Sequence, residues 1–375
     1  MAERLRVGII SANWGAQAHL PAWRSLEGVE VVGICTSRPE TARAAADRYG
    51  IERPYHDYRE MAATKDIDLI DVGTRPPLRY HMVSAAIANG KHVYQGIPFA
   101  ASLADARDMD RQRREAGVVA AVDAFAQAVP AMVHLKELVD GGELGEIFGV
   151  RVSVDLSMFT QGRTNVPDYV WFADPANGTS VLRNFGSHVL HPLVHIFGPI
   201  RSVYSDQSVR LRQWDVEGGD PITPRVPDTA FVVVTFESGL TAQISCVWSM
   251  IDGEGFRMDV WGSKKRVQAT AQFLPQAYDT RLFISENAPM GVRSQQELVV
   301  PERLKAIPGC TLHADEFKVG QFPMASVFDS IREEIAGRGK AAPDFEQALH
   351  VHEVLEAAEI AAREGRRVDL AELPA

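Results

Sequence analysis

Four polar side chains that could handle a proton follow one another at helical spacing in the second half of the chain. Asn184, His188, His191 and His195 are separated by four, three and four positions, which places them on one stripe of a helix. An imidazole can take or give a proton near neutral pH. His188 is therefore a candidate general acid–base, with Asn184 holding either a substrate oxygen or His188 itself by hydrogen bonds.

Two other interpretations of this stripe stay open. Histidines at this spacing are compatible with a metal site, but no Asp, Glu or Cys nearby completes a ligand set, so we expect no metal. The last two histidines also fit partly buried core positions. We favour the core interpretation for His195 and leave His191 open, as either a core residue or part of the substrate site.

A second candidate site lies near the N-terminus. The apolar run from Leu5 to Ile10 predicts a buried strand, which a turn and a helix over residues 19–26 follow. A strand, a glycine-bearing turn and a helix typically bind the pyrophosphate of a dinucleotide at the helix N-terminus. The usual G-x-G-x-x-G motif is reduced here. The expected cofactor-binding residues are Ser11, Asn13, Trp14, Gly15, Ser37, Arg38, Thr74, Arg75, Pro76 and Gln95.

The residues after the second predicted strand, Val29–Cys35, bear on which cofactor is used. An acidic residue at this point would accept hydrogen bonds from a free ribose 2′-hydroxyl. Thr36, Ser37 and Arg38 stand there instead, and they could donate to a 2′-phosphate. The sequence favours NADP over NAD, with a solvated Arg38 as the alternative interpretation.

Further polar residues are expected at the same site. Gln95 ends the fourth predicted strand and is a candidate for the catalytic centre, and Asp123 ends the fifth. The loop over residues 160–173 contains Arg163, Tyr169 and Trp171, and aromatic faces with an arginine suit a hydroxylated ring or a carboxylate. These three residues, with Asp123 and His191, are candidate substrate contacts, and Asp123 could also serve as a base.

The elements that would position these residues form two domains. Strands at Val29–Cys35, 67–72, 92–94 and 118–122 alternate with helices at 41–49, 78–89 and 102–116, which predicts a doubly wound parallel sheet in a dinucleotide-binding domain over residues 1–125. From residue 126 to 375, alternating strands at 147–156, 229–237, 240–249 and 257–261 predict an open, largely antiparallel sheet with helices on one side. An amphipathic helix over 345–364 is expected to pack back near the first domain.

Composition excludes several classes of protein. The chain has 375 residues, 46% of them hydrophobic and 23% charged, with a net charge of −10, so a nucleic-acid partner is not expected. No apolar run is long enough to span a bilayer. The three cysteines have no metal-type spacing and indicate a reducing compartment. We expect a cytoplasmic protein.

The motifs together resemble a known family. The first strand–turn–helix unit, Gly90–Tyr94 leading to Pro98, Gly141–Ile147, Asn184–His191 and Pro343–Phe345 occur in the order typical of the glucose–fructose oxidoreductase/inositol dehydrogenase/MocA (Gfo/Idh/MocA) family. Residues 14–21 and 226–228 are most similar to its galactose-repressor-like branch. The resemblance implies a nicotinamide-binding Rossmann domain and an α/β substrate domain that often forms dimers, here a homodimer or homotetramer.

The chain departs from this family at two places. Typical members carry Glu-Lys-Pro where this chain has Gly96-Ile97-Pro98, and that lysine is catalytic or holds substrate. They also carry carboxylates where Asn184 and His191 stand, while the central histidine survives as His188. The resemblance implies an NAD(P)-dependent oxidoreductase acting on a C–OH or C=O group of a sugar, cyclitol or related hydroxylated compound. The alternatives are a non-catalytic nucleotide-sensing regulator and a redox-assisted lyase or glycosidase without net redox change.

Overall fold

The computed structural model describes residues 4–160, 164–165, 167–286, 290 and 294–374. The chain divides into two compact units. The first comprises residues 1–128 and 305–349, and the second comprises residues 129–304 and 350–375. The first boundary lies near the expected one at residue 125. The second unit is not continuous in sequence, because residues 305–349 return to the first unit.

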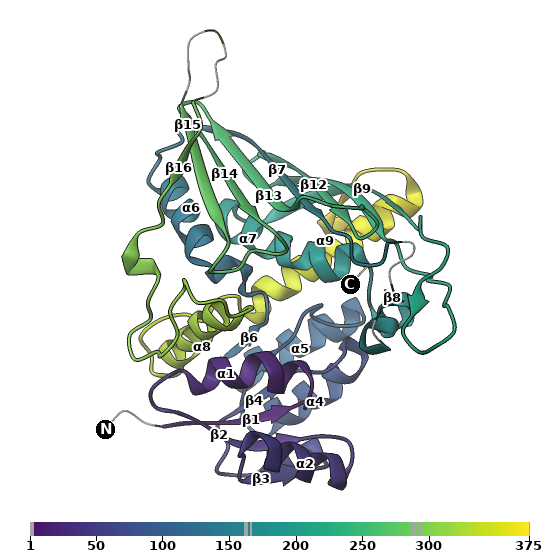
Figure 1. The fold of residues 1–375 in the computed structure, drawn as a ribbon, viewed down its shortest axis with the longest axis vertical. Helices are drawn as coiled ribbons and strands as arrows, with labels where there is room; N and C mark the ends of the chain where they lie inside the picture. Colours follow the sequence, from purple (N-terminus) through teal and green to yellow (C-terminus); the bar gives the residue numbers. More distant parts are fainter. Residues whose placement is uncertain (1–3, 161–163, 166, 287–289, 291–293, 375) are drawn as a thin grey trace. The chain divides into compact units, whose positions relative to one another are not determined.

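The first unit is built on a six-stranded parallel sheet in the order β3-β2-β1-β4-β5-β6 (Figure 1). Its strands are β1 (Leu5–Ile10), β2 (Val29–Cys35), β3 (Arg53–Tyr55), β4 (Leu69–Val72), β5 (His92–Gln95) and β6 (Ala120–Val122). The order reverses direction at β1, as in a doubly wound sheet, and the expected fold class is confirmed. The strand β3, which the sequence analysis did not predict, is short, contains Pro54 and is only partly buried.

Helices cover both faces of this sheet. One apolar core lies under the helical run η1 (Gly15–His19) and α1 (Leu20–Arg24), with α8 (Gln321–Ile335) beside it. The other lies under α3 (Tyr58–Ala63), α4 (Pro76–Ala88) and α5 (Leu103–Ala116), with the first turn of α9 (Phe345–Glu364). The second helix of the domain is α2 (Pro39–Tyr49). The Ser102 side chain caps α5 by accepting from the Asp105 amide at 3.1 Å, as its sequence position predicts.

The second unit contains a mixed nine-stranded sheet in the order β16-β15-β14-β13-β7-β12-β11-β9-β17. All its neighbours are antiparallel except β7 and β12. The strands are β7 (Ile147–Asp155), β9 (Ile200–Ser208), β11 (Thr229–Phe236), β12 (Thr241–Val247), β13 (Gly255–Gly262), β14 (Lys265–Ala271), β15 (Arg281–Glu286), β16 (Gln296–Leu298) and β17 (Val368–Asp369).

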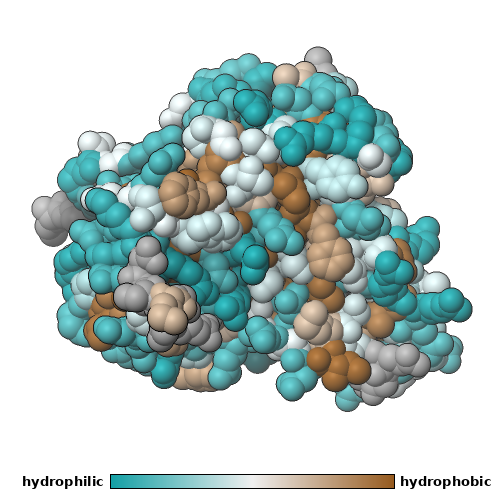
Figure 2. All heavy atoms as spheres, turned by 90° about the horizontal axis from the view of Figure 1, so that it is seen from above, coloured by the Kyte–Doolittle hydropathy of each residue, from teal (hydrophilic) through white to brown (hydrophobic). Residues whose placement is uncertain are grey.

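One face of this sheet is buried beneath α6 (Pro130–Asp140) and the helical run η5 (Leu182–Gly186) to α7 (Ser187–Phe197). The other face is open. Burial alternates along β11 and β12, and Phe231 and Tyr204 stand on the open face, 52% and 43% exposed. Figure 2 shows one face of the molecule, on which apolar residues are interspersed with hydrophilic ones. No helix in the described part of the chain is both long and apolar enough to cross a membrane.

Candidate functional site

The turn after β1 combines an unusual backbone conformation with a close contact between glycines. Ser11 adopts a φ of 138°, a conformation that favours glycine, and its hydroxyl accepts from the Asn13 amide at 3.2 Å. A Cβ atom on Gly73, in the turn after β4, would lie 2.9 Å from the Cα of Gly15. The turns after two neighbouring strands therefore approach each other this closely because residue 73 has no side chain. Asn13 and Trp14 stand exposed in this turn.

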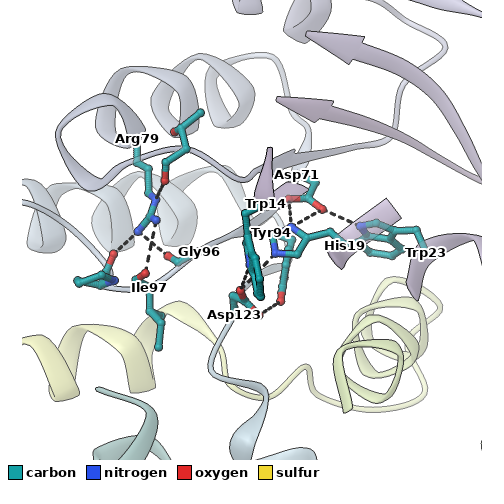
Figure 3. A network of polar contacts seen from close by, with 11 residues as sticks. Trp14, His19, Trp23, Asp71, Arg79, Tyr94, Gly96, Ile97 and Asp123 are labelled. Atoms are coloured by element: carbon teal, nitrogen blue, oxygen red, sulfur yellow. Dashed lines mark hydrogen bonds and ion pairs between the residues drawn. The ribbon is translucent and has the colours of Figure 1, made fainter. Parts of the chain in front are cut away.

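Trp14 leads into a buried ionic network (Figure 3). Its indole Nε1 donates to Oδ2 of Asp123 at 2.9 Å. The same oxygen lies 3.2 Å from Nε2 of His19, and the other oxygen of Asp123 accepts from the hydroxyl of Tyr94 at 2.8 Å. On the opposite side of the imidazole, Nδ1 of His19 lies 2.9 and 3.0 Å from the two carboxylate oxygens of Asp71. His19 is thus held between two aspartates.

The two carboxylates determine the charge of His19. Burial of its ring by itself would lower the pKa, but Asp71 and Asp123 outweigh that effect and raise the pKa to about 10. His19 is therefore an imidazolium at neutral pH, donating one N–H to each aspartate. Burial, together with the charges of both aspartates, raises the pKa of Tyr94 well above its ordinary value, so Tyr94 stays a neutral donor.

The register of the sheet brings these residues together. Asp71 on β4 lies between Ile9 on β1 and Tyr94 on β5, and all three point to the face that α1 and α8 cover. Asp123 follows β6 at the carboxyl edge of the sheet. Behind His19, the indole of Trp23 donates to Asp71 at 2.8 Å and stacks on Phe328 with ring centroids 3.6 Å apart. α8, from the returning segment, therefore closes the network on its inner side.

A buried arginine organises the loop after β5. Arg79 on α4 donates through Nε to the carbonyl of Thr74 at 2.7 Å and through Nη1 to the carbonyls of Gly96, at 2.8 Å, and Pro98. A Cβ on Gly96 would lie 2.7 Å from Nη2 of Arg79, so the guanidinium needs a glycine there. Burial lowers the pKa of Arg79 to about 9, although the charge of Asp123 opposes the shift. A buried cation thus lies beside Ile97, the position at which the resemblance described above implies a lysine.

The predicted cofactor residues of the first unit lie at the carboxyl edge of its sheet or in the turns that follow it. Ser37, Arg38 and Arg75 are exposed, Thr74 is partly exposed, and Pro76 is buried at the start of α4. Gln95 is fully buried and donates to the carbonyl of Phe99 at 3.1 Å. Asp123, which the sequence suggested as a substrate contact or base, is buried with both oxygens bonded to neighbouring side chains.

The histidine stripe lies in η5 and α7 of the second unit. His188 and His195 are partly exposed, whereas His191 is 1% exposed. Burial and the neighbouring His188 and His350 lower the pKa of His191 to about 3, so this ring is neutral and part of the interior. Asn184 is buried, and its Oδ1 accepts from the Ser180 amide at 3.2 Å. His188 and His195 are therefore the two histidines of the stripe that reach the surface, and burial lowers the pKa of His195.

The aromatic residues predicted to contact substrate lie in the second unit as well. Tyr169 is 42% exposed and its ring centroid lies 5.7 Å from that of Phe172, and Trp171 packs edge-on against the same ring at 4.3 Å. Phe172 belongs to a larger buried cluster with Trp248, Phe159, Trp214 and Phe185. Arg163 lies outside the described residues. Within the described part, no three His, Cys, Asp or Glu side chains are grouped to hold a metal.

Several of these residues were not anticipated from the sequence: His19, Trp23, Asp71, Arg79 and Tyr94. One signal was present, because Asp71 is a carboxylate inside the apolar run Ile67–Val72, and a charge in a buried strand needs a partner. The identity of that partner could not be deduced, since His19 is 52 positions away.

Comparisons with known proteins agree along most of the chain. A model of the Gfo/Idh/MocA oxidoreductase family, with an NAD-binding Rossmann fold, matches residues 5–124. A model of the Gfo/Idh/MocA C-terminal domain matches residues 132–268. These ranges cover the sheet of the first unit and the greater part of the second unit's sheet.

Curated relatives and solved structures extend this agreement. D-apiose dehydrogenase from Paraburkholderia graminis is 26% identical over 100% of this chain and 92% of its own length. D-glucoside 3-dehydrogenase from Escherichia coli is 29% identical over 63% of this chain and 68% of its own. Myo-inositol 2-dehydrogenase from Thermotoga maritima is 23% identical over 71% and 75%.

Two solved structures share the fold over nearly the whole chain. An NAD binding oxidoreductase from Klebsiella pneumoniae superposes with a TM-score of 0.86 at 24% identity, covering 98% of this chain and 99% of its own. A levoglucosan dehydrogenase, in complex with NADH and L-sorbose, superposes with a TM-score of 0.84 at 17% identity over 99% and 100%. At these identities the likeness concerns the fold.

Proposed function

Because this chain belongs to the Gfo/Idh/MocA oxidoreductase family, we propose that it is a dehydrogenase that uses NADP(H) and acts on a hydroxyl or carbonyl carbon of a sugar, cyclitol or related compound. The observation that carries the proposal is the close approach of Gly15 and Gly73 at the carboxyl edge of the parallel sheet. Dinucleotides bind in this fold where glycines let the backbone approach the pyrophosphate.

Exposed and buried residues around this edge together fit a nicotinamide dinucleotide. Ser11, Asn13, Trp14 and Gly15 would line the pyrophosphate, and Thr74, Arg75, Pro76 and Gln95 would surround the nicotinamide side. Ser37 and Arg38 follow β2 and are exposed, so they are free to bind a 2′-phosphate. A guanidinium forms strong, charge-assisted bonds with phosphate, which supports NADP over NAD, with NAD as the alternative.

The protein's own contribution to the reaction is to orient the substrate and transfer a proton. Nicotinamide, when bound, supplies the hydride acceptor or donor. His188 is the proposed acid–base: it takes the hydroxyl proton when an alcohol is oxidised and returns it when a carbonyl is reduced. Asn184 is proposed to act beside it. Arg163, Tyr169 and Trp171 are the proposed substrate contacts. Asp123 is not proposed as the base, because both of its oxygens are already bonded.

The substrate class rests on the curated relatives. Three of them are named as dehydrogenases of D-apiose, a D-glucoside and myo-inositol, all polyhydroxylated compounds. Exposed aromatic rings such as Tyr169 suit the apolar faces of such rings. A sugar or cyclitol substrate therefore agrees with both the relatives and the second unit's side chains.

The deciding experiment combines cofactor binding with a substrate panel. Purified protein is titrated with NADPH and NADH, and turnover is followed by nicotinamide absorbance with aldoses, glycosides and cyclitols. Net reduction or oxidation of NADP(H) supports the proposal. Product formation without net absorbance change would instead indicate a redox-assisted lyase or glycosidase, and binding without product from any compound would indicate a nucleotide sensor. Ile97, at the family's lysine position, is the reason to include both outcomes.

Assembly and location belong to the same proposal. The open face of the second unit's sheet, with Phe231 and Tyr204 exposed, is the proposed interface of a homodimer or homotetramer. Cys35, Cys246 and Cys310 are free thiols, which suits the reducing cytoplasm. Equilibrium sedimentation of the wild type and of Phe231→Glu would test the interface, and an unchanged mass in that variant would exclude this face.

A further inference from the structure

The network around His19 has two arms of the same chemistry. Each nitrogen of the imidazole faces one aspartate, and each aspartate accepts an indole N–H. The inner arm runs through Asp71 to Trp23, which is fully buried. The outer arm runs through Asp123 to Trp14, which is 41% exposed. The arms therefore differ in where they end: one in the core, the other at the turn after β1 (Figure 3).

The inner arm has a sufficient structural explanation. A fully buried indole N–H without an acceptor is costly, and Asp71 satisfies the one on Trp23 at 2.8 Å. The outer arm differs, because the Trp14 residue is 41% exposed and its ring is not enclosed by the core. The bond from Trp14 to Asp123 therefore also fixes the orientation of a ring that packing alone does not hold.

Asp123 is held by two side chains other than Trp14. Tyr94 donates to Oδ1 at 2.8 Å, and the His19 imidazolium faces Oδ2 at 3.2 Å. Both oxygens of Asp123 are therefore held by other side chains, and a carboxylate acceptor binds an N–H more strongly than a neutral acceptor does. Trp14 lies between Asn13 and Gly15, so a ring that is fixed at its indole nitrogen also fixes the backbone of this turn.

We infer that Asp123 is a positioning residue for the nicotinamide cofactor: held by His19 and Tyr94, it fixes the Trp14 indole and, through it, the turn from Ser11 to Gly15 that receives the dinucleotide. The inference rests on the proposed function for its cofactor, and on the contacts of the first unit alone for its mechanism. It gives the buried ion cluster a role in cofactor binding.

The first test needs no cofactor. The chain contains six tryptophans, and the Trp14 indole signal in a proton–nitrogen correlation spectrum is assigned by its loss in Trp14→Phe. We expect slow hydrogen exchange of this N–H in the wild type and fast exchange in Asp123→Ala. Equal exchange rates in both proteins would overturn the inference.

The second test measures cofactor affinity. Trp14→Phe keeps an aromatic ring and removes the N–H, whereas Asp123→Ala removes the acceptor. Each is expected to raise the Kd for NADP(H) about tenfold, the loss of one charge-assisted bond, and the double variant no further than either single one. Trp23→Phe is the matched control on the inner arm: it should lower the melting temperature and leave the Kd within about twofold.

The outcomes separate the two proposals. Unchanged or additive effects on the Kd, with a wild type that binds NADP(H), would overturn the inference and leave the proposed function standing. A wild type that binds neither nucleotide would overturn the proposed function and the cofactor role of Asp123 together. If Asp123→Ala does not fold, the Kd of Trp14→Phe alone tests the inference. This variant removes the same hydrogen bond by deleting its donor and leaves the buried carboxylate of Asp123 in place.

Discussion

Nε2 of His19 lies 3.2 Å from Asp123, while Nδ1 of the same ring lies 2.9 Å from Asp71. A neutral imidazole has one N–H and could donate to only one of these carboxylates. Because an aspartate lies on each side of the His19 ring, the ring carries both protons. Through these two contacts His19 connects the helical run after β1 with β4 and with the end of β6. The ion cluster thus joins the turn from Ser11 to Gly15, the proposed cofactor turn, to the centre of the sheet.

His19 is expected to remain an imidazolium well above neutral pH. Its pKa is raised to about 10, so the ring nitrogens should show doubly protonated chemical shifts at pH 8. By contrast, burial lowers the pKa values of His191 and His352 to about 3, and their rings should be neutral there. A neutral His19 at pH 8 would contradict the two-sided ion pair.

The same ionisation makes stability depend on pH. The folded-state pKa is higher than the unfolded value of about 6.5, so the contribution of His19 is fully present below pH 6.5 and is lost as the pH rises through 10. Urea denaturation should show the free energy of unfolding decreasing by up to about 4 kcal/mol across this window. A His19→Gln variant should lack this component, and an unchanged slope would assign the pH dependence to other groups.

Arg79→Lys is expected to destabilise the first unit although it keeps the charge. One ammonium group cannot reproduce the fork that reaches the carbonyls of Thr74, Gly96 and Pro98. The free energy of unfolding should fall by about 2–3 kcal/mol, as for buried acceptors left unsatisfied. Arg59→Lys, on a side chain that is 69% exposed, is the control and should change stability by less than about 0.5 kcal/mol.

Arg38→Ala should discriminate between the two nicotinamide cofactors. If the guanidinium binds a 2′-phosphate, its removal should weaken NADPH about tenfold or more and leave NADH unaffected. Both dissociation constants can be measured by quenching of protein fluorescence. Arg43→Ala removes another exposed arginine of α2 and should alter neither constant. Equal losses for both nucleotides in Arg38→Ala would argue against a 2′-phosphate site.

His188→Ala should abolish turnover and preserve cofactor affinity. Removing a general acid–base typically costs between about a hundredfold and ten thousandfold in rate, whereas the cofactor turn belongs to the first unit. Steady-state kinetics on the best substrate, with NADP(H) titrations alongside, measure both quantities. His195→Ala, on the same stripe, is the control and should retain most of the turnover. Wild-type rates in the His188 variant would exclude the proposed role.

The elements of the fold were predictable wherever local patterns were strong. The strand Val29–Cys35 and the helix Phe345–Glu364 have the bounds that their sequences indicate, and Ser102 caps its helix as expected. β3 escaped prediction because three partly buried residues with a proline leave no periodicity to detect. The return of residues 305–349 to the first unit depends on tertiary packing, such as that of Phe328 on Trp23, which no local pattern encodes.

The positions of the turn and of the histidine stripe could be predicted from the sequence, but the buried ion cluster could not. The turn from Ser11 to Gly15 and the histidine stripe follow from motif and spacing. The ion cluster does not, because His19, Asp71 and Asp123 are far apart in sequence and each fits an ordinary position by itself. Asp123 looked like an available carboxylate at a strand end. Its contacts with Tyr94, Trp14 and His19 are evident only in the folded structure.

The returning segment has a consequence for how the chain matures during synthesis. The first 128 residues leave the ribosome early. Trp23, however, packs against Phe328, which is synthesised only after residues 129–304. Until then the nascent first unit carries an uncovered aromatic patch. We therefore expect translation products that stop before α8 to aggregate or to bind chaperones. We also expect the turn from Ser11 to Gly15 to become able to bind the proposed cofactor only near the end of elongation.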